Sequence, residues 1–108
     1  MLDEERFDFI PVTPGRLPAR LLRIAGAITF ASAKNPGFWT NHVHTGVALR
    51  LDLQSPSLDE PLRVRLEQRF PRQSEILIVE RELRGQLANV TAAIAKLDEA
   101  VGDVFEGV

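Results

Sequence analysis

The sequence predicts an α+β fold: a small antiparallel β-sheet of about four strands, followed by one amphipathic C-terminal α-helix. Two patterns predict this class. Between Val43 and Leu53 apolar and polar residues alternate, as they do in a strand that buries one face. Beyond Gly85 apolar residues recur every three or four positions, as they do along the buried stripe of a helix. A chain of 108 residues is long enough to bury one core, so we expect a single domain over residues 1–108.

We expect three segments within this domain. Residues 1–15 form an extended N-terminal arm, residues 16–84 form the antiparallel sheet, and residues 85–108 form the C-terminal helix. In the arm, Pro11 restricts the extended segment to the edge of a sheet, because proline has no N–H to donate. Gly15 then favours a turn.

Residues 20–32 have two competing interpretations. As a helix, the segment would place on one face Leu21, Ile24, Ala25 and Ile28. As a strand, it would place on one face Leu22, Ile24, Gly26, Ile28 and Phe30. We favour the strand, because the run from Ile28 to Phe30 consists of residues typical of strands.

Alternation predicts two further strands. From Val43 to Leu53 the apolar face carries Val43, Thr45, Val47, Leu49, Leu51 and Leu53. After a loop, Leu62, Val64 and Leu66 alternate with Arg63, Arg65 and Glu67. We expect these two segments to form an antiparallel pair.

The run from Ile76 to Val79 is short, apolar and rich in β-branched residues, which predicts a strand covered on both faces. After Gly85 the predicted helix buries one stripe, formed by Leu87, Val90, Ile94, Leu97, Val101 and Val104. An alternative stays open, in which one long helix begins at Ser74 and forms a coiled coil through apolar residues spaced every seven positions. Glu80 on its seam and Gly85 in its interior oppose it, because glycine costs about 1 kcal/mol relative to alanine inside a helix.

The composition restricts the chemistry. The chain has no cysteine, which excludes disulfides, cysteine-ligated metals and thiol nucleophiles. Its first residues are acidic, unlike a secretory signal, and no apolar run approaches the roughly 20 residues that span a bilayer. We therefore expect no membrane partner, and a location in the cytoplasm or within a particle assembled inside the cell.

Charge is divided along the chain. Residues 16–74 hold nine basic and four acidic side chains, whereas residues 75–108 hold three basic and seven acidic ones. If the predicted strands pair, five arginines share one face: Arg23, Arg50, Arg63, Arg65 and Arg69. Guanidinium groups bind phosphates and carboxylates, so this face is a candidate anion or nucleic-acid site. The pI near 5.7 and the lack of aromatic residues among the arginines favour a solvated face instead.

We expect no enzyme. His42 and His44 have the spacing of two metal ligands on one face of a strand, but no further ligand lies nearby in the sequence, so we expect neither a metal nor another cofactor. None of the serines lies in a nucleophile elbow, and the chain has no glycine-rich phosphate loop.

The loop that carries Phe38, Trp39 and Asn41 is the candidate for partner binding, because exposed aromatic residues anchor protein partners. The alternative is that these aromatic residues fold back onto the core. A sheet covered on one side also leaves edges free for pairing. We expect a non-enzymatic protein-protein interaction or assembly module, such as a structural subunit, adaptor or inhibitor, in oligomeric form. The alternative is a nucleic-acid-associated module that binds phosphates through the arginines.

Overall fold

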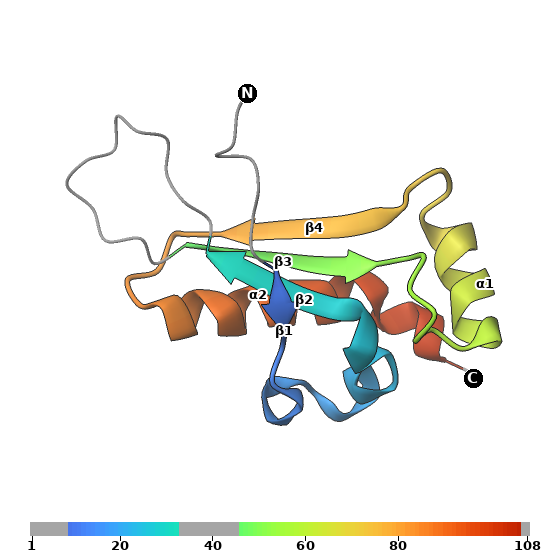
Figure 1. The fold of residues 1–108 in the computed structure, drawn as a ribbon, viewed down its shortest axis with the longest axis horizontal. Coiled ribbons are helices and arrows are strands. Elements are labelled where there is room, and N and C mark those ends of the chain that lie inside the picture. The colour runs from blue at the N-terminus through green and yellow to red at the C-terminus, as the bar shows by residue number, and fades with distance from the viewer. Residues whose placement is uncertain (1–8, 33–45, 107–108) are drawn as a thin grey trace.

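The computed structural model describes residues 9–32 and 46–106, and it confirms the α+β fold with a C-terminal helix. Its antiparallel sheet has the strand order β1-β2-β3-β4 (Figure 1). The strands are β1 (Ile10–Pro11), β2 (Ile28–Ser32), β3 (Val47–Asp52) and β4 (Glu75–Glu80). The α-helices are α1 (Glu60–Arg69) and α2 (Gln86–Val101), and the 3-10 helices are η2 (Pro14–Arg16), η3 (Ala19–Ala27) and η4 (Gly102–Phe105).

The core lies between one face of the sheet and α2. In the registers of the sheet, Phe30 lies opposite Leu49, and Leu49 lies opposite Ile78, so these side chains share the face toward the helix. The buried apolar residues of α2 are Val90, Ala93, Ile94, Leu97 and Val101. The burial predicted for Leu87 in this stripe is wrong, since it is 53% exposed. In Figure 1, α2 runs behind the strands along the length of the sheet, and α1 lies at one end of it. We call the face toward α2 the inner face and the opposite one the outer face.

The helix predicted after Gly85 is confirmed, and the continuous helix from Ser74 is wrong. Residues 75–80 pair with β3 over their whole length, because the β-branched run suits an extended backbone. Gly85 is extended and precedes α2 as its N-cap. Coverage of β4 on both faces is also wrong, since Leu77 is 46% exposed and Val79 is 45% exposed.

The strand predicted for residues 62–67 is wrong, because these residues belong to α1. The Asp59 side chain caps this helix by accepting a hydrogen bond from the Leu62 amide at 3.3 Å. Leu62 and Leu66, four positions apart, are buried, whereas Val64 faces solvent. The capping signal of aspartate followed two positions later by Pro61 was present in the sequence. The alternation between residues 62 and 67 is therefore not a strand pattern.

Residues 20–32 contain both of the structures that competed for them. The 3-10 helix η3 covers the first part and β2 covers the second, which leaves the predicted strand correct only from Ile28 onward. Leu21 and Ile24 are buried, whereas Leu22 is 48% exposed. The helical segment is not continuous, because Ile24 has non-helical dihedral angles of φ −118° and ψ 18°.

Candidate functional site

The free edge of β4 is the first candidate surface. Among residues 9–32 and 46–106, β4 is the last strand of the sheet and pairs only with β3. The Leu53 amide donates to the Ser74 carbonyl at 3.0 Å. This bond shows which residue pairs of β3 and β4 are hydrogen-bonded, because bonded and non-bonded pairs alternate along an antiparallel ladder. Even-numbered residues of β4 therefore bond to β3, while the backbone groups of Glu75, Leu77 and Val79 point away from the sheet. These groups are a template for pairing with another strand.

The side chains on the outer face of β4 are apolar at the centre and acidic at one end. Leu77 and Val79 are each nearly half exposed. Beside them, the Glu75 carboxylate forms an ion pair with Arg50 of β3 at 3.0 Å. The guanidinium carbon of Arg50 lies 5.3 Å from the centre of the Phe9 ring. Exposed apolar side chains next to unpaired backbone groups are the usual features of a protein-binding edge.

Glu80, at the end of β4, has a different environment on the inner face. Its side chain is 5% exposed, and its Oε1 lies 2.5 Å from Nζ of Lys96 on α2. This contact holds the pKa of Glu80 below its usual range, against the opposing effect of burial. The same contact raises the pKa of Lys96. The pair joins the end of β4 to the middle of α2 at the border of the core.

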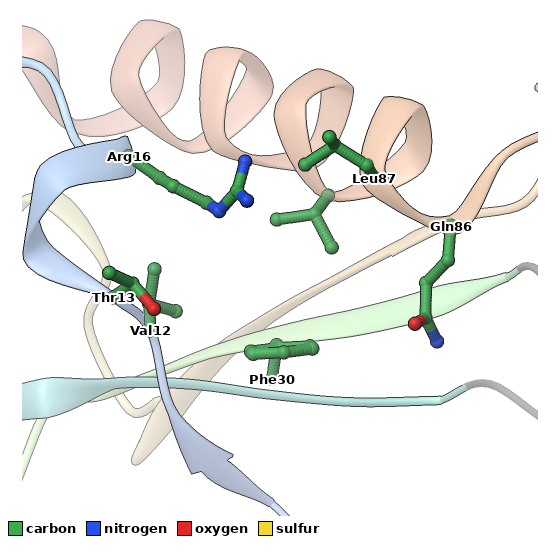
Figure 2. Close-up of a pocket in the computed structure, with 7 residues that line it drawn as sticks. Val12, Thr13, Arg16, Phe30, Gln86 and Leu87 are labelled. Atoms are coloured by element: carbon green, nitrogen blue, oxygen red, sulfur yellow. The ribbon is translucent and has the colours of Figure 1, made fainter.

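A pocket beside the first turns of α2 is the second candidate site (Figure 2). Its volume is about 190 Å³. It is lined by Val12, Thr13, Arg16, Phe30, Gln86, Leu87 and Val90. The lining therefore combines residues next to β1, one residue of β2, and residues of α2 that are far away in the sequence.

Three of the five arginines predicted to share a sheet face lie on α1 instead. Arg63 is turned toward the loop before this helix, where its Nη2 donates to the carbonyl oxygens of Ser55 at 3.1 Å and Leu58 at 3.3 Å. Arg65 points to the other end of the chain and donates from Nη1 to the carbonyl oxygen of Val104 at 3.4 Å. The two guanidinium groups thus bind backbone carbonyls of different segments.

Arg65 Nη1 also donates to the carbonyl oxygen of Glu106. Arg69, at the last turn of α1, lies 3.4 Å from the Asp103 carboxylate of η4. Its guanidinium carbon is also 5.0 Å from the ring centre of Phe70. Both side chains therefore attach α1 to the C-terminal end of the described chain.

Arg23 and Arg50 lie on two further elements, η3 and β3. Arg23, on η3, forms an ion pair with Asp59 at 3.0 Å. Arg50 lies on β3 and is paired with Glu75, as described above. The expected common face is therefore wrong, because the strand that was to carry three of its members is a helix. The structure gives each of the five arginines a partner within the chain.

The predicted partner-binding residues Phe38, Trp39 and Asn41 lie outside the described residues, as do the histidines His42 and His44. Within residues 9–32 and 46–106, no three histidine or acidic side chains are grouped closely enough to hold a metal ion.

Sequence reasoning missed two features of this site. The exposure of Leu77 and Val79 depends on β4 being an edge strand, and nothing in the local pattern shows which strand is last in the sheet. Arg16 lies in no recognisable binding motif of the sequence. It is a candidate binding residue only because the fold brings Phe30 and Leu87 near it.

None of the helices in the described part of the chain is both long and apolar enough to cross a membrane. Comparison with known protein families and with curated proteins found no match for this chain.

Proposed function

We propose that this protein is a non-enzymatic interaction module that assembles with itself through the free edge of β4. The observation that carries the proposal is the combination, on one strand, of exposed apolar side chains at Leu77 and Val79 with backbone groups that have no partner among the described residues. A partner strand would satisfy these backbone groups and cover the two side chains at once. The proposal includes an oligomeric state and a cytoplasmic location.

A second copy of the chain is the partner that best fits this edge. Two copies related by a twofold axis pair their β4 strands antiparallel. When Ile78 of each copy lies opposite Ile78 of the other, Leu77 lies opposite Val79 on the outer face. In the same register Glu75 lies opposite Arg81 of the second copy, which places opposite charges at both ends of the pair.

The neighbouring symmetric register is less favourable. If Leu77 lies opposite Leu77, Glu75 lies opposite Val79, so a carboxylate meets an apolar side chain at both ends. On the outer face, charge complementarity therefore favours the register centred on Ile78. In this register the two four-stranded sheets become one continuous sheet, with the helices α2 of both copies on its inner face.

The test is the molar mass in solution, measured by light scattering on a sizing column over a range of concentrations. We expect a species with twice the 12.0 kDa mass of the chain. Val79→Lys should return this species to the monomer, because a charged side chain on an edge strand opposes pairing. The matched control is Val64→Lys, since Val64 is exposed to a similar extent, 40% against 45%, but lies on α1. A monomeric wild-type protein, or a dimer that survives Val79→Lys, would contradict the proposal.

A charge exchange tests the register itself. Glu75→Arg should weaken the dimer by placing like charges opposite each other, and the double variant Glu75→Arg with Arg81→Glu should restore it. If the double variant dissociates as readily as the single one, the register centred on Ile78 is wrong.

Nucleic acid that copurifies with the protein and is released by salt would favour the nucleic-acid alternative instead.

A further inference from the structure

The pocket between β2 and α2 has an apolar body. Phe30, Leu87, Val12 and Val90 contribute apolar surface to its wall. Its volume of about 190 Å³ exceeds the roughly 150 Å³ of an apolar cavity that accepts benzene. A space of this size holds one six-membered ring and a small substituent. Ligand pockets generally combine such an apolar wall with a few polar groups that fix orientation.

Arg16 supplies the charged group of this pocket. Figure 2 shows its side chain extending from η2 toward Leu87 on α2, on the same side of the pocket as the helix and across from Phe30. In the part of the chain that the structure describes, the Arg16 side chain forms neither an ion pair nor a hydrogen bond. This distinguishes it from Arg20, Arg23 and Arg50, which are paired with carboxylates.

The rest of the lining adds no negative charge. Its remaining polar residues are Thr13 and Gln86, which are neutral. The first turn of α2 contains no acidic residue, and its N-cap Gly85 offers no side chain to the free amides. Neither an acidic residue of the first turn nor an N-cap side chain therefore compensates the positive end of this helix dipole. An anionic group beside Arg16 would meet positive potential from both sources.

We infer that this pocket binds a small apolar carboxylate, whose ring or hydrocarbon body lies against Phe30 and Val90 and whose carboxylate pairs with Arg16. The pocket has room for an acid with about the bulk of benzoate. The guanidinium selects the ionised acid over a neutral molecule of the same shape, because it donates paired hydrogen bonds to carboxylate oxygens. The inference is independent of pairing at β4, which lies on the other edge of the sheet.

The experiment is a titration of the full chain with benzoate and, separately, with benzamide, followed through the backbone amide signals in NMR spectra. Benzamide has nearly the same shape as benzoate but no charge. We expect benzoate to shift the amides of the lining residues in a saturable manner, with benzamide binding at least about tenfold more weakly. Arg16→Gln should weaken benzoate to the level of benzamide. Arg16 is exposed and its side chain has no partner among the described residues, so this variant should keep the wild-type spectrum elsewhere.

The matched control is Arg72→Gln, which removes the same charge from the exposed turn before β4 and should leave benzoate binding unchanged. Equal affinity for benzoate and benzamide would overturn the inference, because it would show an apolar hole without selection for charge. Shifts that do not saturate, or an equal loss of benzoate binding in both variants, would overturn it as well, because they would show general attraction of an anion to the surface.

Discussion

Asn89 makes a pair of hydrogen bonds with the backbone of a single residue, Leu83. Its Nδ2 donates to the Leu83 carbonyl oxygen and its Oδ1 accepts from the Leu83 amide, both at 3.0 Å. The amide side chain thus binds the backbone N–H and C=O of the connection between β4 and α2, as the backbone of a neighbouring strand would. Asn89 is fully buried in the first turns of α2, so the connection is held against the helix from inside.

Removal of this contact should destabilise the protein. Asn89→Ala deletes both hydrogen bonds to Leu83 and leaves a small cavity, so we expect the free energy of unfolding to fall by about 2 to 3 kcal/mol. Urea denaturation measures this value. The control is Thr91→Ala on the exposed side of the same helix, which should change the free energy by less than about 0.5 kcal/mol. Equal values for the two variants would show that Asn89 does not hold the connection.

The ion pair between Glu80 and Lys96 should make stability depend on pH on the acid side. The pKa of Glu80 in the folded protein is below its ordinary value of 4.5, so the folded state favours the ionised form. Its contribution is therefore fully present above about pH 4.5 and is lost as the pH falls through the lowered pKa. Urea midpoints measured from neutral to acid pH should fall less steeply for Glu80→Gln than for the wild type. Glu67→Gln, at an exposed position on α1, should follow the wild-type curve.

Lys96→Met should change the sign of this dependence. Without the ammonium group, burial becomes the dominant effect on Glu80 and raises its pKa above the ordinary value. The variant should then be less stable than the wild type near neutral pH, and it should gain stability relative to the wild type as the pH falls. A constant difference between the two curves at all pH values would contradict the role assigned to the pair.

The buried stripe of α2 predicts unequal costs for two leucines of one helix. Leu97 is 1% exposed against the sheet, whereas Leu87 is 53% exposed at the rim of the pocket. We expect Leu97→Ala to lower the free energy of unfolding by about 2 to 5 kcal/mol through lost burial and the cavity left behind. Leu87→Ala should change it by less than about 1 kcal/mol. Denaturation in urea compares them directly, and similar costs would mean that α2 packs with another face.

Gly26 predicts a steric conflict that can be relieved at a second position. A Cβ at residue 26 would lie 2.8 Å from Cβ of Ser57, which is too close for two carbon atoms. Gly26→Ala should therefore cost about 1 to 3 kcal/mol, and adding Ser57→Gly should recover most of it. Gly15→Ala is the control, because no atom lies within 4 Å of its added methyl group, and it should be neutral or stabilising by about 0.4 to 1 kcal/mol. Failure of the second substitution to rescue the first would place the conflict elsewhere.

The parts of the fold that could be predicted are those with a long local pattern. The stripe from Val90 to Val101 spans several helical turns, and the alternation around Leu49 and Leu51 spans a full strand. The stripe repeats often enough to exclude the two-residue period of a strand, and the alternation repeats often enough to exclude the 3.6-residue period of a helix. The segment around Leu62 is shorter. Its alternating apolar residues Leu62, Val64 and Leu66 fit a strand that buries all three, and they fit equally well a helix that buries Leu62 and Leu66 and leaves Val64 facing solvent. The residue that distinguishes the two structures is Asp59, which caps the helix.

By itself the sequence determined the α+β class, the presence of a helix after Gly85 and the strand character of β3, because periodicity is a local property of the chain. It left β4 open between a strand and the start of a longer helix, and pairing with β3 decided for the strand. Only the tertiary structure decided which strand lies at the edge, which arginines have partners, and that Arg16 lies near Phe30 and Leu87. These features depend on contacts between segments far apart in sequence, and such contacts are set by the packing of the whole core. Both candidate surfaces belong to this second group.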